Sequence, residues 1–413
     1  MNCYCSTILD KINPKMKNIH CKTLFTENKI YKMSKINTNL THQQVAVSHN
    51  GQTFLWLSHN QLKTPTTWQD IGKHQSLSSD QALNLWRQKT ATIWHGDFHQ
   101  AKALLAAAKR RLQKPAKTGN NLLETFHKHR LQQQQKSHLL SHLYVLVAPH
   151  WQLNLSRAPD IAEACQQAFG FDNQEPVLLS LQALLGYLGA EQWHQTGVTI
   201  DALDKQRIHV PFGVFSPLRG EYLNLLLQAP LPASCQMAWD IGTGSGVIAA
   251  ILAKRGIAHI IATDTNAQAL AAASANFERL QVSKNIDLRA QDLFVEGKAD
   301  LIVCNPPWLP GKPSSVIETA IYDANSAMLK GFLNGVLEHL NANGQAWLII
   351  SDLAERIGLR QPNDLNDWIA QANLRILKRY DTQPLHSKSQ DSSDPLYQAR
   401  SQEITSLYCL VAK

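Results

Sequence analysis

The chain has 413 residues, of which 44% are hydrophobic and 17% charged, and its formal net charge is +8. This length allows two or three domains, each with an ordinary buried core. No apolar stretch approaches the ~20 residues that a membrane-spanning helix needs, which excludes a protein built on such helices. We therefore expect a globular protein without a membrane partner.

The seven cysteines are informative about metal binding and compartment. Their number is odd, and they lack the paired spacing of zinc ligands. Cys3 and Cys5 lie close together, but no set of His or Cys residues completes a site with them. This usage is typical of reduced thiols, so we expect a cytoplasmic protein that holds no metal.

Residues 1–32 differ in composition from the rest of the chain. They are rich in Lys and Asn, hold three of the seven cysteines and lack the apolar core of a secretory signal. The run Met33-Ser34-Lys35 resembles a second start of translation. We expect residues 1–32 to be a disordered tail or to lie upstream of the true start.

Residues 33–200 are predicted to form a mostly helical N-terminal domain. The aromatic and aliphatic run Thr53–Leu57 indicates a strand, whereas Ala101–Leu112 and Leu122–Leu143 have the spacing of amphipathic helices. Val177–Leu188 is strongly apolar and is predicted to be a helix that packs inside. The connector to the second half of the chain follows this helix.

Positive charge is concentrated in the middle of this N-terminal region. Residues 101–157 carry ten Lys and Arg against Glu124 alone, a net charge of +9. Residues 211–413 hold 17 basic and 19 acidic side chains and are close to neutral. The basic segment indicates either a footprint for RNA or the ribosome, or simply the solvated face of helices.

A glycine-rich turn follows a short apolar strand near the middle of the chain. Met237–Asp240 reads as the strand, and Gly242, Gly244 and Gly246 form a tight turn before an apolar helix that begins at Val247. Glycine permits positive φ and lets a ligand approach the backbone closely. The pattern is typical of a nucleotide-binding βαβ unit.

Carboxylates follow three successive predicted strands. Asp240 directly precedes the glycine turn, where it can receive a ligand ammonium group. Asp264 lies twenty positions beyond Gly244, about where an acidic residue meets ribose hydroxyls in such units. Asp292 follows the next strand and could accept a hydrogen bond from an adenine amine.

These carboxylates separate two possible cofactors. The dinucleotide fingerprint of NAD proteins needs a third glycine at position 247, where Val247 stands. Acidic partners for an ammonium group, a ribose and an adenine describe S-adenosylmethionine better than NAD. We therefore expect S-adenosylmethionine, bound by Asp240, the three glycines, Asp264 and Asp292.

The segment Asn305-Pro306-Pro307-Trp308 follows a hydrophobic strand and is predicted to be catalytic. The Asn305 side-chain oxygen and the Pro306 carbonyl are two hydrogen-bond acceptors beside the flat indole of Trp308. The two prolines fix φ and remove backbone donors, so the turn is stiff. Such a site suits a planar –NH2 group, either an exocyclic base amine or a primary amide. The preceding Cys304 is interpreted as an apolar strand residue rather than a nucleophile.

Together these motifs resemble the class I S-adenosylmethionine-dependent methyltransferases. The resemblance is closest to the small-domain branch, which holds the release-factor glutamine methyltransferases and several base N-methyltransferases, and it covers residues 205–413. It implies an α/β fold, a Rossmann-like, doubly wound sheet of seven strands whose last hairpin is antiparallel. Family members cover the cofactor with the segment at Val210–Pro217, so Phe215 is expected against the methionine chain or adenine, or else in the core.

The alternation of helices and strands continues after the motif. Leu309–Ser314 is expected to be a flexible loop that shapes the substrate entrance, and Glu318–Asp323 resembles the acidic-apolar segment of glutamine methyltransferases. The remaining expected elements are a helix over Ala327–Leu340, a strand over Gln345–Ile350, helices over Leu353–Ile357 and Asn363–Ala372, and strands over Leu374–Tyr380 and Glu403–Val411.

The resemblance leaves the acceptor open. The leading hypothesis is a protein glutamine side chain, for example on a translation factor or ribosomal protein, with residues 33–200 recognising the substrate. Against it, Trp308 replaces the tyrosine common in that group, and the large N-terminal region does not match the group's compact helical domain. The alternative is an amino group of rRNA or DNA, which the charge of residues 101–157 favours. A third reading is an RNA- or ribosome-binding protein without catalysis.

Overall fold

The computed structural model describes residues 42–413 except 61, 116, 219, 316 and 385–390. The described residues belong to one compact unit, residues 39–413. The expected tail at residues 1–32 and the start at Met33 lie outside the described residues. Among the described residues, no helix is both long and apolar enough to cross a membrane.

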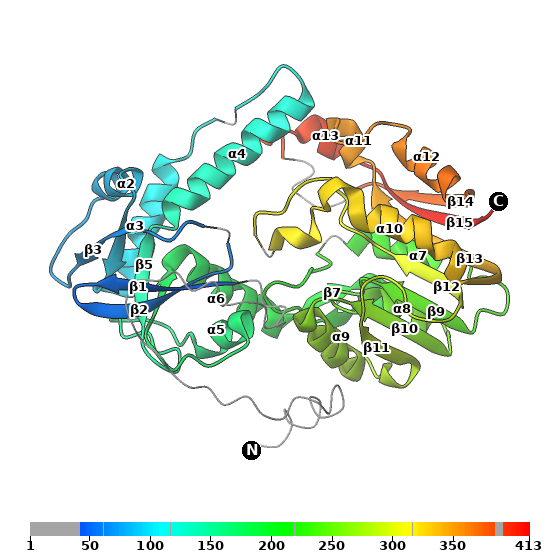
Figure 1. Cartoon of the computed structure of the whole chain (residues 1–413), viewed down its shortest axis with the longest axis horizontal. Helices are drawn as coiled ribbons and strands as arrows, with labels where there is room; N and C mark the ends of the chain where they lie inside the picture. Colours follow the sequence, from blue (N-terminus) through cyan, green and yellow to red (C-terminus); the bar gives the residue numbers. More distant parts are fainter. Residues whose placement is uncertain (1–41, 61, 116, 219, 316, 385–390) are drawn as a thin grey trace. The chain divides into compact units, whose positions relative to one another are not determined.

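The second half of the chain forms a seven-stranded sheet in the order β11-β10-β9-β12-β13-β15-β14 (Figure 1). The strands are β9 (Met237–Ile241), β10 (His259–Asp264), β11 (Ile286–Ala290), β12 (Ala299–Cys304), β13 (Leu340–Ser351), β14 (Leu374–Thr382) and β15 (Thr405–Ala412). The first five are parallel, and β15 pairs antiparallel with both β13 and β14. The predicted seven-stranded sheet with an antiparallel last hairpin is confirmed.

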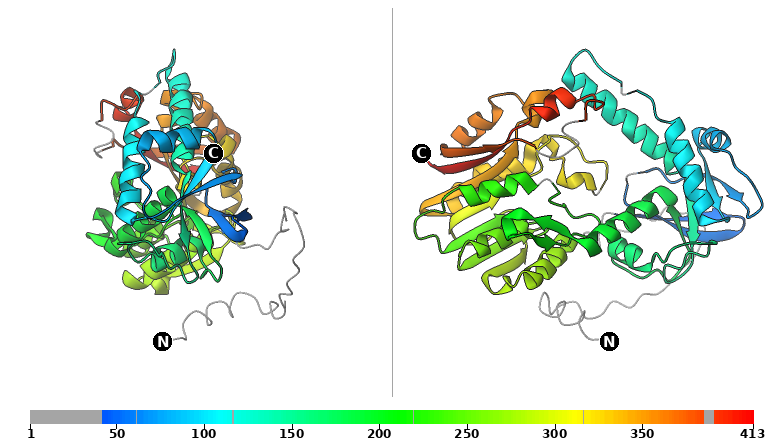
Figure 2. Two further views of the ribbon diagram at one scale, coloured as in Figure 1. Left: turned by 90° about the vertical axis from the view of Figure 1, so that its left-hand side faces the viewer. Right: turned by 180° about the vertical axis from the view of Figure 1, so that it is seen from behind.

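Helices cover both faces of this sheet, as two views of the ribbon show (Figure 1, Figure 2). Its helices are α7 (Leu223–Gln228), α8 (Val247–Lys254), α9 (Ala267–Arg279), α10 (Ala327–Val336), α11 (Leu353–Ile357), α12 (Asp364–Gln371) and α13 (Tyr397–Ser401). Helices α7, α8 and α9 share one buried cluster with the sheet, and α10 and α12 share the cluster on the other face. The chain is therefore doubly wound.

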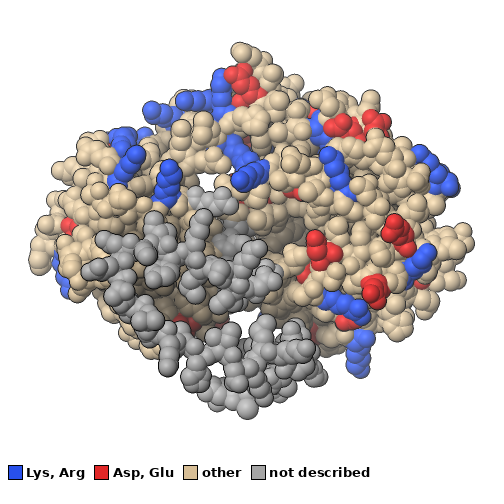
Figure 3. All heavy atoms as spheres, viewed as in Figure 1, with Lys and Arg blue, Asp and Glu red and all other residues tan. Residues whose placement is uncertain are grey.

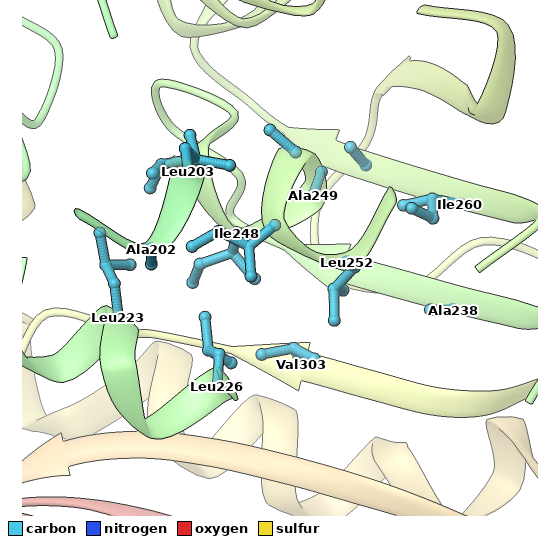
Figure 4. Close-up of a cluster of buried hydrophobic side chains, with 14 of the residues drawn as sticks. Ala202, Leu203, Leu223, Leu226, Ala238, Ile248, Ala249, Leu252, Ile260 and Val303 are labelled. Carbon is cyan, nitrogen blue, oxygen red and sulfur yellow. The ribbon is translucent and has the colours of Figure 1, made fainter. Parts of the chain in front are cut away.

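The central strands are apolar on both faces because both faces are covered. Strand β12 sends Leu301 and Val303 into the cluster with α8, and Ile302 and Cys304 into the cluster with α10. Figure 4 shows the first cluster, where Val303 lies with Ile248 and Leu252 of α8. Cys304 is fully buried, and burial raises the pKa of its thiol, so its interpretation as a core residue is confirmed.

The N-terminal region holds a second sheet, of six strands in the order β1-β2-β6-β5-β4-β3. Its strands are β1 (Gln43–His49), β2 (Gln52–Ser58), β3 (Thr67–Ile71), β4 (Thr90–Trp94), β5 (Leu143–Val147) and β6 (Val177–Ser180). Its helices are α2 (Ser79–Arg87), α3 (Phe98–Arg111), α4 (Leu122–Leu140), α5 (Ala162–Phe169) and α6 (Leu181–Thr196). The prediction of a mostly helical domain is therefore corrected to an α/β domain built on a mixed sheet.

The missed strands lie inside segments predicted to be helical. The helix expected over Leu122–Leu143 ends at Leu140, and β5 begins at Leu143. All four residues of β6 are buried, and α6 begins directly after it at Leu181. A short, fully buried strand shows no alternation of apolar and polar residues, so periodicity cannot separate it from the start of an apolar helix.

A small hairpin connects the two sheets. It pairs β7 (Val198–Ile200) with β8 (Gln206–Ile208), and the boundary predicted at residues 200–205 falls within it. Ala202 and Leu203, between its strands, pack in the same buried cluster as α8 (Figure 4). The connector therefore packs in the same core as α8, the helix that follows the glycine turn.

Candidate active site

The glycine turn joins β9 to α8 at the carboxyl end of the sheet. Gly242, Gly244 and Gly246 all have positive φ, at 70°, 55° and 83°. A Cβ atom on Gly246 would lie 2.5 Å from a ring carbon of Phe277, so this position requires glycine for space as well as for conformation. Gly244 faces open space beyond the turn's own carbonyl, which leaves room for a ligand against the backbone.

Asp240 lies under this turn and is fully buried. Its Oδ2 accepts hydrogen bonds from the Thr243 hydroxyl at 2.6 Å and from the Ala249 N–H at 3.0 Å. Its Oδ1 is buried and has no hydrogen-bond partner among the residues that the structure describes. Burial raises the pKa of this carboxyl to about 7. An unpaired buried carboxylate oxygen is costly, so the geometry fits a ligand donor such as an ammonium group.

Asp264 lies at the end of β10, two positions beyond the residue that pairs with Asp240 of β9. Its Oδ2 accepts the Gly244 N–H at 2.9 Å, and its Oδ1 accepts the Asn266 N–H at 2.8 Å. Burial raises its pKa, while these backbone hydrogen bonds act in the opposite direction. Asp264 is therefore bonded to the glycine turn, and its predicted contact with ribose hydroxyls stays a prediction.

Asp292 lies in the loop after β11. Its side chain is exposed and forms no hydrogen bond or ion pair with any described residue. The neighbouring Gln291 N–H donates to the Asp264 carbonyl at 3.1 Å, which holds this loop against the end of β10. The contact of Asp292 with an adenine amine stays a prediction.

The predicted catalytic segment follows β12, the strand beside β9. Cys304 pairs with Ile241 in the register of these parallel strands, so Asn305 and Gly242 follow at the same edge. The Trp308 indole N–H donates to the Asn305 Oδ1 at 2.9 Å. This hydrogen bond was not predicted, and it fixes which atom of the Asn305 amide faces the indole. One lone pair of the oxygen remains for another donor.

Tyr222 is a residue of this site that the sequence did not indicate. It is fully buried before α7, and its ring lies 6.0 Å from that of Trp308 in an edge-to-face arrangement. Burial raises the pKa of Tyr222, and the charge of Asp240 adds to the rise. Tyr222 therefore packs beside the indole of the predicted catalytic segment.

Phe215 is half-buried and packs against the cluster that includes Tyr222 and α8. Trp308 packs against the same cluster. The core contact expected for Phe215 is therefore present, and its contact with a cofactor stays a prediction. Among the described residues, no group of three or more His, Cys, Asp or Glu side chains could hold a metal ion.

Comparisons with known proteins show what this chain is similar to. The family model "Methyltransferase small domain" matches residues 205–356. Over 164 residues the chain is 31% identical to a release factor glutamine methyltransferase of Cereibacter sphaeroides, covering 34% of this chain and 59% of that protein. Over 146 residues it is 31% identical to a tRNA1(Val) (adenine(37)-N6)-methyltransferase of Cytophaga hutchinsonii, covering 32% and 61%.

Among solved structures, the fold is similar to a ribosomal protein L11 methylase of Lactobacillus delbrueckii subsp. bulgaricus. The TM-score is 0.35 and the identity 21%, over 51% of this chain and 87% of that one. The chain spans about 60% of the length of the two curated relatives named above. Residues 205–356 therefore match the model of the methyltransferase small domain, in agreement with the resemblance that the motifs carry.

Proposed function

We propose that this protein transfers a methyl group from S-adenosylmethionine to a planar –NH2 group. The observation that carries the proposal is the meeting of two sets of residues at the ends of β9 and β12. The unpaired Asp240 oxygen and the glycine turn suit the cofactor, and the acceptor-rich turn at Asn305 and Trp308 adjoins them. Ligands of open α/β sheets bind at this edge.

The cofactor half of the site is assigned by its polar groups. The Oδ1 of Asp240 would accept the ammonium group, and Asp264 would accept the ribose hydroxyls beside Gly244. The bound cofactor supplies a methyl group that its sulfonium already activates. The residues of this half therefore bind and orient, and no side chain needs to form a covalent intermediate.

The acceptor half of the site aligns a weak nucleophile. The nitrogen of an amide or aryl amine is weakly nucleophilic because its lone pair is delocalised. The free lone pair of the Asn305 oxygen and the Pro306 carbonyl would accept its two N–H bonds and stabilise the positive charge that develops there. Trp308 would restrict the plane of the group. Alignment of two reactants can contribute up to ~7–11 kcal/mol.

A protein glutamine side chain is the acceptor that we favour. The support is the Asn-Pro-Pro-aromatic segment followed by the acidic-apolar residues Glu318–Asp323. In addition, one of the proteins to which this chain is similar is a release factor glutamine methyltransferase. The acceptor protein, for example a translation factor or a ribosomal protein, would be recognised in part by the N-terminal region.

An amino group of RNA or DNA is the second candidate, and a specific surface favours it. Four of the ten basic residues in 101–157 form ion pairs, those of Arg111, Lys128, Arg130 and Arg157. The other six form no ion pair with any described residue, namely Lys102, Lys109, Arg110, Lys114, Lys117 and Lys136. Lys and Arg gather over the α3–α4 part of the face in Figure 3. Unpaired cations of this kind bind phosphates.

The experiment that separates these candidates follows a labelled methyl group. Labelled S-adenosylmethionine and the protein are added to a cell extract, after which protein and nucleic acid are separated and counted. Label in a protein band supports the glutamine acceptor, and label in RNA or DNA supports the base acceptor. An Asn305→Ala variant is the control, since it should bind the cofactor and transfer little label. The absence of both label transfer and cofactor binding would support the non-catalytic reading.

A further inference from the structure

The segment after Trp308 folds back on itself in two limbs, residues 309–315 and 318–323, which we term the acceptor loop. The Leu309 N–H donates to the Ile321 carbonyl at 3.2 Å, and the Asp323 N–H donates to the Leu309 carbonyl at 2.9 Å. The two limbs therefore close at the residue that directly follows Trp308. Any shift at this base would move the indole.

The second limb also leads to the cofactor half of the site. The Asp323 carboxylate accepts the N–H groups of Met328 and Leu329 at the start of α10. The terminal methyl of Met328 lies over Gly242, at 2.6 Å from where a Cβ on that glycine would be. The acceptor loop thus connects Trp308 to the glycine turn by a short path through α10.

One side chain from the N-terminal region holds both limbs together. The Arg130 Nη2, on α4, donates to the Lys312 carbonyl at 2.6 Å and to the Glu318 Oε2 at 2.9 Å. Its guanidinium carbon lies 3.9 Å from the centre of the Tyr322 ring. Lys312 belongs to the first limb, and Glu318 and Tyr322 belong to the second. One nitrogen of the guanidinium donates both hydrogen bonds while the planar group lies over the Tyr322 ring, a face that lysine does not have.

The ion pair between Arg130 and Glu318 is largely buried, and Ser314 also donates to Glu318. The Arg130 and Glu318 side chains are 19% and 27% exposed, so solvent screens them less than a surface pair. The same Glu318 oxygen accepts both the N–H and the hydroxyl of Ser314 at 2.8 Å. One oxygen of Glu318 therefore accepts hydrogen bonds both from α4 and from the first limb.

The apolar side of α4 provides a second contact with the acceptor loop. Phe126 is buried in a cluster with Leu309, next to Trp308 in the chain, and with residues of α11. Leu122, Phe126 and Arg130 recur every four residues and so lie on one face of α4. Leu122 packs against the same cluster. This face of α4 therefore packs against the acceptor loop.

We infer that Arg130 is a positioning residue, which holds the acceptor loop so that Trp308 and Asn305 present their acceptor geometry. The inference rests on the proposed function, because it concerns the acceptor half of that site. It makes the N-terminal region a structural part of the catalytic centre as well as a surface for substrate recognition. The hydrogen bonds by which Asp323 holds the start of α10 do not involve Arg130. Arg130 also contacts neither Asp240 nor Asp264 by any hydrogen bond or ion pair, so its effect should be confined to the acceptor half.

The test compares Arg130→Ala with a control variant, Arg157→Ala. Arg157 also forms an ion pair, but its partner, Asp97, does not belong to the acceptor loop. Hydrogen exchange of peptides over residues 309–323 is measured first, without any acceptor. We expect exchange there to rise at least tenfold in Arg130→Ala and to stay at the wild-type rate in Arg157→Ala. The dissociation constant of S-adenosylmethionine, measured by calorimetry, should change less than twofold in both.

Methyl transfer into the cell extract is then measured with the same proteins. We expect the initial rate to fall at least tenfold in Arg130→Ala and to be intermediate in Arg130→Lys, which keeps the charge and loses the planar group over Tyr322. Glu318→Gln tests the same contact if Arg130→Ala fails to fold. Unchanged exchange of the loop, or unchanged transfer, in Arg130→Ala would overturn the inference. A wild-type protein that transfers no label would contradict the proposed function alone, because the exchange result still decides whether Arg130 holds the loop.

Discussion

The hydrogen bond between Trp308 and Asn305 gives a sharp test of the acceptor half of the site. Replacing Trp308 by Phe keeps an aromatic plane and removes the single N–H that donates to Asn305 Oδ1 at 2.9 Å. Without this donor the Asn305 amide can flip and present its NH2 group to the acceptor. Two NH2 groups would then face each other, so the productive orientation is populated less often.

The magnitude follows from the value of one hydrogen bond. A typical hydrogen bond contributes about 0.5–1.5 kcal/mol, which corresponds to a fall in kcat of roughly 2- to 12-fold. The dissociation constant of S-adenosylmethionine should stay within twofold, since Asp240 and Asp264 keep their contacts. Initial rates of label transfer and calorimetric titrations of the same preparation provide both numbers.

A matched control separates the hydrogen bond from the general loss of a tryptophan. Trp193 on α6 is 60% exposed, so Trp193→Phe should leave rate and cofactor affinity at the wild-type level. The reasoning is refuted if Trp308→Phe retains the full rate. It is also refuted if cofactor affinity and rate fall by the same factor, because the indole would then act on the cofactor rather than through Asn305.

Three further predictions concern the cofactor half. Asp264→Ala should weaken S-adenosylmethionine binding by ~1–3 kcal/mol, roughly 5- to 150-fold, with little change in kcat, as measured by calorimetry and saturation kinetics. Gly246→Ala should lower the free energy of unfolding by about 1–3 kcal/mol in urea titrations, because φ is 83° and the added methyl would strike Phe277. Burial raises the pKa of Asp240 to about 7, so cofactor affinity should rise with pH between 6 and 8 as this carboxyl ionises.

The sign of the pH effect follows from linkage. Because the folded-state pKa of Asp240 lies above its ordinary value, the folded protein without cofactor holds the proton more tightly and loses stability from this group as pH rises toward 7. An ammonium ligand favours the ionised form, so its binding should release a proton, which calorimetry in buffers of different ionisation enthalpy detects. Affinity that is flat from pH 6 to 8, or equal in Asp240→Asn, would contradict the assignment.

Each of the other two predictions also has a contrary outcome. Cofactor affinity that survives Asp264→Ala would remove this residue from the ribose site. Wild-type stability of Gly246→Ala would mean that the glycine is required by neither conformation nor space.

The seven-stranded sheet was expected from the resemblance, whereas the local signals alone predicted only alternating helices and strands. Strand β9, the glycine turn and α8 follow one another without a gap, and a carboxylate or the Asn-Pro-Pro turn stands at or just after the ends of β10, β11 and β12. The parallel order of β9 and β12 then brings Asp240 and Asn305 to one edge. This strand order agrees with the predicted site, whose contacts with cofactor and acceptor stay predictions.

The N-terminal sheet shows where local signals fail or were overlooked. Asn50 and Gly51, both with positive φ, form the turn between β1 and β2, and an Asn-Gly pair between alternating segments is a strong hairpin signal. Strand β6 gives no such signal, because its apolar residues continue into those of α6. Its identity as a strand depends on pairing with β2 and β5, which lie far away in the sequence.

Contacts between distant side chains were the least predictable part of the site. The hydrogen bond from Trp308 to Asn305 depends on the rotamers of two nearby residues, which spacing does not specify. Arg130 and Glu318 are 188 positions apart, and neither belongs to a motif that identifies the other. Such pairs become visible only once the tertiary fold places α4 on the acceptor loop.

The most direct test of the central claim identifies the atom that receives the methyl group. The protein is incubated with S-adenosylmethionine carrying a deuterated methyl group and a cell extract, and the products are digested to amino acids and nucleosides for mass spectrometry. The account predicts the label on a planar nitrogen, either a glutamine amide or an exocyclic base amine, and its loss in Asn305→Ala. Label on an oxygen, a sulfur or a carbon atom would contradict it.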